Sequence, residues 1–548
     1  MKKNIIFYSV IILLIIAKLY LISSLPISAE YTTILDDALF VKQANSIVEG
    51  RWLGDYDNTT LIKGVFMPLF IVVLYIFKIP YIIGQELFYS IACVLFITII
   101  KDKVKSKPIL LIIFTILLLN PITYSTELCR IYRDGVYASL ILYLVSFIYA
   151  IFLKREEPAK KLVKYFIGLG FSFSAIYLCR EETIWIMPFV IIATIITIGF
   201  IIKQKKKLLL YLIPTGILTI SILIVCLLNY KYYGVFELNQ YWNTSFKSAY
   251  GALTRVTPEQ RKERVPVTRE TLHRVYEISP KFNELKDYLE SEEGYEWASY
   301  GDGTNIYEIE GGWLHWAIMF AAQSKGYYES ATKANQYYID LANEINEAVD
   351  TGKIEGLDRK RVSNSIITTK EDIPKIVKKI KNTIRFEYKM LGMKIKINRY
   401  PYRDEEYAEY EKMFDKMIIG QEFTQDTFAS EASQFKINVL QKIFDIYKSV
   451  NEYIFYLSIV LYIILTILFI IRPKKTYQEF LILSSLLVIY LSRVVTIGYT
   501  SQQMFTEAIN TSYLACIYGI QYLFGMLAII FVFEKIKELR GEIREKNI

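Results

Sequence analysis

Histidine is nearly absent from this chain, which has only His273 and His315 in 548 residues. Chemistry that needs several histidines, such as a histidine-ligated zinc or a Ser-His-Asp triad, is therefore not expected. The sequence also lacks the glycine-rich loops that hold nucleotide phosphates. Gly168-Leu-Gly170 lies inside an apolar run, where helix packing explains it.

Cysteine is also scarce, with five residues and no spacing typical of a metal site. Cys93, Cys226 and Cys516 lie inside apolar runs, where buried and unreactive thiols are expected. Cys129 and Cys179 lie near the ends of such runs, and a disulfide between them is the less favoured alternative to two free thiols. A fold held together by disulfides is excluded.

Apolar residues are abundant but unevenly distributed. They make up 53% of the chain, and the mean hydropathy is +0.28. Apolar runs crowd residues 1–229 and 452–533, whereas 230–450 has the composition of a water-soluble domain. A small soluble enzyme and a disordered chain are excluded. The sequence predicts an α-helical polytopic membrane protein with one large water-exposed insert.

The net charge is +9, from 64 Lys and Arg against 55 Asp and Glu. The excess lies in short loops between apolar runs, where it sets the topology and faces anionic lipid, so nucleic-acid binding is not predicted. The positive-inside rule predicts that the basic clusters are cytoplasmic. These clusters lie at residues 101–107, 154–164, 203–207, 472–475 and 535–546.

The first apolar run, Ile5 to Ile22, follows Lys2 and Lys3. A signal peptide cleaved near Ile27-Ser28-Ala29 is one interpretation, and an uncleaved first span with a cytoplasmic N-terminus is the preferred one. The run from Val65 to Phe77 is shorter and reaches only about 20 Å, against the roughly 30 Å of the hydrocarbon core. Because a span there would invert every later basic cluster, we predict a re-entrant or interfacial helix.

Ten spans remain, and both termini are predicted to be cytoplasmic. The spans cover approximately residues 5–22, 81–100, 108–124, 136–153, 163–179, 184–202, 208–229, 453–471, 480–499 and 512–533. They divide the chain into three domains. These are an N-terminal membrane module at 1–229 with its first outer loop at 23–80, an extracytoplasmic domain at 230–451, and a C-terminal membrane module with a cytoplasmic tail at 452–548.

The insert is predicted to be mainly helical and of the α+β type. Tyr230 to Val256 is aromatic and irregular, and a strand is one interpretation. Residues 259–300 are predicted to be helical with a break at Ser279-Pro280, and helices dominate after Trp313. His315 is predicted to be packed rather than catalytic. A core-facing stripe with helical spacing is formed by Ala331, Ala334, Tyr338, Leu341, Ile345 and Ala348.

Ionisable residues gather at the predicted outer face. Lys18, Glu86 and Arg493 lie in the outer parts of their spans, and anchoring at the membrane edge explains Lys18. Two short outer turns contain Glu127, Arg130, Arg133 and Asp134 in one, and Arg180, Glu181 and Glu182 in the other. Anchoring does not explain so many charges of mixed sign, so we predict a functional site that includes Glu86, Glu181 and Glu182.

The first outer loop carries an acidic pair, Asp36-Asp37, at the start of a predicted amphipathic helix that lies on the membrane. Adjacent carboxylates can hold a divalent cation such as Mg²⁺ or Mn²⁺, or can take a proton from a hydroxyl. The alternative is a solvated pair that the helix dipole favours.

A first span, an outer loop with Asp36-Asp37, and a lysine turn that opens a short apolar helix, Lys63-Gly-Val-Phe-Met-Pro68, resemble the GT-C glycosyltransferases. The closest resemblance is to the bacterial branch related to protein O-mannosyltransferases and aminoarabinose transferases. It covers roughly residues 1–230 and extends more weakly to 533. The sequence departs from the Lys-Pro-Pro motif typical of the family, and the insert is unlike the small β-rich modules of the eukaryotic enzymes.

The resemblance implies roles for individual residues. Asp36 or Asp37 would be catalytic, with Asp36 the first choice, and Asp134 would be the acid of a second outer turn. Arg493 resembles the basic residues that late spans direct at the donor phosphate. The candidates for binding that phosphate are Lys63, Arg130, Arg133, Arg180 and Arg493.

The function implied is a glycosyltransferase of the bacterial plasma membrane. It would move a sugar from a polyprenyl-phosphate donor to an extracytoplasmic glycan, lipid or protein, and membrane lipids would be its other partners. Two alternatives stay open: a ligase or polymerase acting on lipid-linked glycans, and a non-catalytic transporter or sensor. The span interiors are almost free of charge, which disfavours transport.

Overall fold

The computed structural model describes residues 2–25, 35–241, 243–301, 303, 307–358, 368–395 and 431–546. Ten helices within these ranges are long and apolar enough to cross a membrane, which confirms the predicted number of spans and the helical membrane fold class. The candidate signal-peptide cleavage site at 27–29 lies outside the described residues. All five cysteines are buried free thiols.

Ten apolar helices form the membrane bundle, and two of them, α5 and α8, reach the length of a span together with the adjoining 3-10 turns. They are α1 (Lys2–Ile22), α4 (Tyr81–Ile100), α5 (Lys107–Leu118), α6 (Arg133–Leu153), α7 (Ala159–Cys179), α8 (Met187–Ile201), α10 (Leu212–Tyr233), α20 (Glu431–Ile471), α21 (Pro473–Gln503) and α22 (Thr511–Lys546). Helix α6 is the most buried of the ten candidate spans and packs against α4, α7 and α22, whereas α10 is the least buried. The bundle is therefore organised around α6.

Between α2 (Asp37–Val48) and α4 lies the short helix α3 (Phe66–Ile76). With 11 residues it spans only about 16 Å, and it is not among the ten candidate spans, so the prediction of a short apolar helix is confirmed. Its re-entrant or interfacial position stays a prediction. Gly64 precedes it at a close approach to the end of α7. A Cβ there would lie 2.0 Å from the Leu178 carbonyl oxygen, so only glycine fits.

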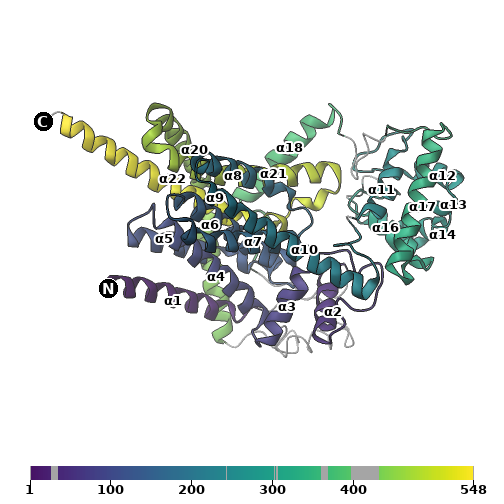
Figure 1. Cartoon of the computed structure of the whole chain (residues 1–548), viewed down its shortest axis with the longest axis horizontal. Helices are drawn as coiled ribbons and strands as arrows, with labels where there is room; N and C mark the ends of the chain where they lie inside the picture. The colour runs from purple at the N-terminus through teal and green to yellow at the C-terminus, as the bar shows by residue number, and fades with distance from the viewer. Residues whose placement is uncertain are drawn as a thin grey trace.

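The basic clusters gather at one end of the bundle. Glu479 at the start of α21 pairs with Lys103 (3.2 Å) and with Lys535 (3.5 Å), and Lys107 donates to Asn4 (2.6 Å). Both chain termini lie at this same end, and the insert lies at the opposite end (Figure 1). This separation is what the positive-inside prediction requires, because one membrane face then holds every basic cluster.

Labelling with a membrane-impermeant maleimide checks which end is cytoplasmic. Asp55, at the insert end, has a side chain that is 99% exposed, and Lys105 is exposed at the basic end. We expect Asp55→Cys to be labelled on intact cells and Lys105→Cys only after permeabilisation. The native thiols are buried, so they should contribute little background. Labelling of Lys105→Cys on intact cells would invalidate the ten-span orientation.

The compact part of the insert is helical. Its helices are α11 (Thr244–Arg255), α12 (Arg269–Ile278), α13 (Pro280–Asn283), α14 (Lys286–Leu289), α15 (Glu292–Ser299), α16 (Leu314–Ser324) and α17 (Ala331–Asp350). The α17 stripe, from Ala331 to Ala348, is buried as predicted. The interpretation of Tyr230 to Val256 as a strand is wrong, because α10 continues to Tyr233 and α11 occupies much of the remainder.

No strand occurs in the part of the chain that the structure describes, so the β component expected for the insert is not found there; two isolated bridges, Val256 to Gly356 and Lys262 to Val265, are the nearest approach to it. Helix α11 forms instead because Asn243 caps its N-terminus: the Asn243 side chain accepts a hydrogen bond from the Phe246 amide.

Two segments connect the insert with the bundle. Leu39 of α2 and Ile62 belong to the apolar core of the insert, so the first loop is packed beneath it. Helix α18 (Asp372–Tyr388) lies antiparallel along α21, since Ile380 contacts Gly498 and Glu387 accepts a hydrogen bond from Tyr490 (2.9 Å). Residues 372–388 were predicted to belong to the extracytoplasmic domain, but helix α18, which they form, packs against the membrane bundle.

Candidate active site

The acidic pair lies at the insert end of the bundle, at the start of α2. Asp36 immediately precedes the helix and makes no capping bond with its side chain. Lys63, just before α3, pairs with it, with its Nζ 3.0 Å from Asp36 Oδ1. The side chains are 25% exposed for Asp36 and 10% for Lys63, so Asp36 remains reachable from solvent.

Electrostatics keep Asp36 ionised. Burial alone would raise the pKa of Asp36, but Lys63 and Arg133 outweigh it and hold the pKa below its usual value. Burial lowers the pKa of Lys63, and Asp36 only partly offsets this. Asp36 is therefore an ionised carboxylate, and it stabilises the charged form of Lys63, which burial disfavours.

Asp37 has a different environment from Asp36. It is fully buried, and Arg130 donates hydrogen bonds to its carboxylate. Arg130 Nε lies 3.1 Å from Asp37 Oδ1 and 3.0 Å from Oδ2, and Nη2 lies 2.8 Å from Oδ1. Such a bidentate pair fixes the position of α2 against the turn before α6. Asp37 is thus committed to a structural contact, whereas Asp36 is accessible.

The predicted divalent cation can be tested against these contacts. Mg²⁺ and Mn²⁺ need several oxygen ligands that are not already neutralised. The oxygens of Asp37 are held by Arg130, and Asp36 Oδ1 is held by Lys63. The residues present do not fit a divalent cation.

Glu181 joins the α3 segment to the start of α6. Its Oε1 accepts a hydrogen bond from the Gly64 amide (2.9 Å), and its Oε2 accepts one from Arg133 Nη1 (2.6 Å). Arg133 in turn lies close enough to Asp36 to lower the pKa of that carboxyl. Glu181 therefore positions the lysine-bearing segment beside the acidic loop.

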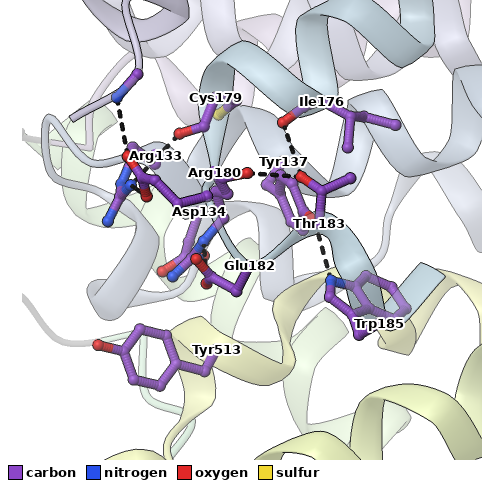
Figure 2. A network of polar contacts seen from close by, with 12 residues as sticks. Arg133, Asp134, Tyr137, Ile176, Cys179, Arg180, Glu182, Thr183, Trp185 and Tyr513 are labelled. Carbon is purple, nitrogen blue, oxygen red and sulfur yellow. Dashed lines mark hydrogen bonds and ion pairs between the residues drawn. The ribbon is translucent and has the colours of Figure 1, made fainter. Parts of the chain in front are cut away.

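A second group of charges lies where α7 ends (Figure 2). Arg180 pairs with the buried Asp134 of α6 and also with Glu182, at 2.7 Å. Burial opposes the ionisation of Glu182, but Arg180 and Arg133 outweigh it and lower the pKa of Glu182 to about 2. Tyr513 of α22 lies beneath the Arg180 guanidinium, 5.2 Å from it. Asp134 is buried and paired, so it buttresses Arg180.

Arg493 of α21 completes this end of the site. It is 1% exposed, its Nε donates to the Tyr513 carbonyl (2.9 Å), and its guanidinium stacks over the Trp185 ring at 5.1 Å. Within the described residues, neither Nη1 nor Nη2 has a partner. A buried guanidinium with two unused donors is costly unless an anion meets it.

The insert contributes an aromatic side chain, Trp316, that was not predicted from the sequence. Trp316 of α16 lies over Lys63, with the lysine Nζ 5.6 Å from its ring centre. His315 beside it is packed against Tyr241, and burial lowers the pKa of His315 to about 3, so it stays neutral. The expectation that His315 is packed is confirmed. Trp316 could not be found from a motif, because its contact with Lys63 joins residues far apart in the chain.

Glu86 is not part of this arrangement. It forms an ion pair with Lys18 at 2.5 Å, and both side chains are fully buried. Lys18 also donates to Thr123 Oγ1 at 3.2 Å. The interpretation of Lys18 as an anchor at the membrane edge is wrong, because its charge is neutralised inside the bundle.

We expect this pair to support stability. Breaking a buried pair by Lys18→Met should cost about 3–5 kcal/mol, because Glu86 is left uncompensated, whereas Lys18→Met combined with Glu86→Leu should recover most of the loss. Thermal unfolding of the purified protein in detergent checks both variants. A double variant no more stable than the single one would show that the pair is not the cause.

The structure therefore brings most of the predicted site residues together. Asp36, Lys63, Arg133 and Glu181 form one connected group, and Asp37 with Arg130 lies beside it. Arg180, Asp134 and Glu182 form the second group, and Arg493 lies near it.

The chain was compared with protein-family models, curated proteins and solved structures, and only solved structures are similar to it. No family model matches the chain, and no curated protein matches it. Two solved structures are similar over most of its length, both of ArnT from Cupriavidus metallidurans. The one bound to undecaprenyl phosphate has 10% identity, a TM-score of 0.32, and coverage of 96% of this chain and 78% of its own. The apo structure has 10% identity, a TM-score of 0.33, and coverage of 94% and 77%.

Proposed function

We propose that this membrane protein is a glycosyltransferase that moves a sugar from a polyprenyl-phosphate donor to an acceptor outside the cytoplasm. The observation that carries the proposal is Arg493. Its buried Nη1 and Nη2 are unpartnered in the described chain, at the end of the bundle where Lys63 also lies. A guanidinium with two parallel donors matches a phosphate, which accepts both bonds at once.

A second feature supports a lipid-linked phosphate over a soluble one. An apolar cavity of about 80 Å³ lies between α6, α8 and α21, with Val488 of α21 in its wall. Val488 is five residues from Arg493 along the same helix, or about 8 Å. Other lining residues are Ile148, Phe152, Phe189, Ile192 and Leu481. The cavity continues from Val488 toward the basic end of the bundle, so it would take the part of a prenyl chain remote from a phosphate at Arg493.

The charges suit the chemistry of glycosyl transfer. The acceptor hydroxyl attacks the anomeric carbon, the bond from that carbon to the phosphate oxygen breaks, and the phosphate leaves with both electrons. Lys63 and Arg493 would neutralise this leaving group. Asp36 would take the proton of the acceptor hydroxyl, because one of its oxygens, Oδ2, makes no bond in the described structure.

The Lys63–Asp36 pair would couple donor binding to catalysis. A phosphate competes with Asp36 for the lysine Nζ. When Lys63 turns to the phosphate, Asp36 loses its nearest cation, so the pKa of Asp36 rises and the carboxylate becomes a stronger base. Arg130 and Asp37 would hold the loop in place meanwhile.

Binding of undecaprenyl phosphate to the purified protein tests the proposal, with undecaprenol as the matched ligand that lacks the phosphate. Native mass spectrometry should detect the phosphate-bearing lipid at concentrations where undecaprenol is not retained. In membranes that contain the protein, label from radioactive undecaprenyl-phosphate hexose should then move to another fraction. Equal retention of both lipids, with no movement of label, would refute the proposal.

A further inference from the structure

A second, polar cavity lies between the bundle and the insert. Its volume is about 250 Å³, whereas a single water needs only about 10–15 Å³ of such space. One wall comes from the membrane module, with Gly64, Glu181 and the last turn of α7. The facing wall comes from the segment that leads into α11, with Glu237, Asn239, Asn243 and Thr244. The cavity therefore exists only where the insert meets the bundle.

The free group in this cavity is the Glu237 carboxylate. Its Oε2 accepts hydrogen bonds from Asn243 Nδ2 (3.0 Å) and Asn335 Nδ2 (3.1 Å), which fix the side chain. Its Oε1 makes no bond, and Glu237 makes no ion pair, within the described residues. Glu181, in the opposite wall, is already neutralised by Arg133. The cavity thus offers one unneutralised hydrogen-bond acceptor among neutral polar groups.

The cavity shares residues with the candidate active site. Gly64 is the neighbour of Lys63 in the chain, and Glu181 contacts both Gly64 and Arg133. A ligand in this cavity would therefore lie within one or two residues of the lysine that pairs with Asp36.

These walls select for a class of ligand. An anion would be repelled by the uncompensated Glu237. A purely apolar group would leave the Glu237 Oε1 atom without a hydrogen-bond donor. A metal ion would find one free carboxylate only, since both oxygens of Glu181 are committed. A neutral group with several hydroxyl donors satisfies the Glu237 carboxylate without bringing a charge into the cavity.

We propose that this cavity at the junction of bundle and insert binds a sugar ring, with Glu237 accepting its hydroxyl hydrogen bonds. The proposal rests on the glycosyltransferase function above, and the ring belongs either to the donor or to the acceptor. In both cases residues of the insert would help to select which sugar takes part in the reaction.

Glu237→Gln is the sharpest variant. The glutamine oxygen can keep accepting from Asn243 and Asn335, so the amide nitrogen replaces Oε1 and turns an acceptor into a donor with little change in shape. Thr244→Trp is a second variant, because Thr244 is exposed at the cavity edge and the larger ring would occupy the space. Glu329→Gln, at an exposed carboxylate elsewhere on the insert, is the matched control.

Two binding measurements on the full-length protein separate the sources of the sugar. The first compares undecaprenyl-phosphate glucose with undecaprenyl phosphate, and the second follows a panel of methyl glycosides by saturation-transfer NMR with undecaprenyl phosphate present. Loss of a charge-assisted hydrogen bond predicts at least an approximately tenfold weaker sugar-dependent affinity in one arm for both variants. Affinity for undecaprenyl phosphate itself should not change, and Glu329→Gln should behave as wild type.

A loss in the glucose arm assigns the cavity to the donor sugar, and a loss in the glycoside arm assigns it to the acceptor. Unchanged sugar binding in both arms, in variants with wild-type thermal stability, would overturn the proposal. Failure of undecaprenyl phosphate to bind at all would instead count against the proposed function, and the glycoside arm repeated without the lipid would still decide whether the cavity takes a sugar.

Discussion

Asp36→Asn should lower the rate of sugar transfer by about 10²–10⁴-fold, the usual contribution of a general base. Asparagine keeps an oxygen that can accept the Lys63 hydrogen bond, but it cannot take a proton. Thermal stability should fall modestly, because Lys63, which is only 10% exposed, keeps the hydrogen bond but loses the opposite charge. The measurement is single-turnover transfer from labelled undecaprenyl-phosphate hexose, together with a melting curve for the same preparation.

Two controls make this result specific. Asp55→Asn removes an exposed carboxylate from the same loop and should leave both transfer and melting unchanged. Asp37→Asn should mainly reduce stability, because it disrupts the buried contact with Arg130. Near-normal transfer by Asp36→Asn would remove this loop from the catalytic step.

The pH dependence adds a check on the role of Asp36. Because Lys63 and Arg133 hold the pKa of Asp36 below its usual value in the protein without donor, the carboxylate is ionised near neutrality before the donor binds. A fall in kcat/KM between pH 7 and pH 5, which reports the protein before the donor binds, would therefore have to come from another group. The rate of Asp36→Asn should follow the same profile at a much lower level.

The spans could be predicted because their signals are local. Each is a long apolar run, and the basic clusters between runs decide the direction of insertion. The short helix α3 was predicted for the same reason: a span there would have put all later clusters on the other face. The stripe on α17 also follows from spacing alone, since Ala334 and Tyr338 are one helical turn apart.

The errors concern contacts between distant segments. Lys18 and Glu86 lie 68 positions apart, and nothing near either residue indicates its partner. Helix α18 lies within the polar stretch 230–450 and was therefore assigned to the water-exposed domain. Its other face packs along α21, where Gly498 leaves room for Ile380. A helix can satisfy both environments, so composition does not decide its location.

The site was predicted as a set of residues but not as a set of pairs. Counting charges in short turns identified Arg130, Arg133 and Arg180. The structure places the acidic loop beside them, since Arg130 pairs with Asp37. Which acid stays accessible depends on which arginine reaches it. Arg130 takes Asp37 and leaves Asp36 to Lys63, a choice fixed by the packing of α2 against α6.

Arg493→Met should weaken binding of undecaprenyl phosphate by roughly 10- to 150-fold, the equivalent of about 1.5–3 kcal/mol for hydrogen bonds to a charged group. Methionine keeps an apolar side chain of similar length, although the contact of the guanidinium with the Trp185 ring is lost. Melting of the protein without lipid should be unchanged or slightly raised, because the substitution removes a buried charge whose Nη1 and Nη2 are unpartnered in the described chain.

The melting temperature with added lipid separates this role from a purely structural one. Undecaprenyl phosphate should raise the melting temperature of the wild type and of Lys231→Met, which loses an exposed cation at the same end of the bundle. Arg493→Met should show little increase, because a ligand stabilises only in proportion to its affinity for the folded state. If Arg493 served only to support Glu182 and Asp134, the variant would melt earlier without lipid and would still bind the phosphate. Glu182 and Asp134 already pair with Arg180, so the structure favours the first outcome.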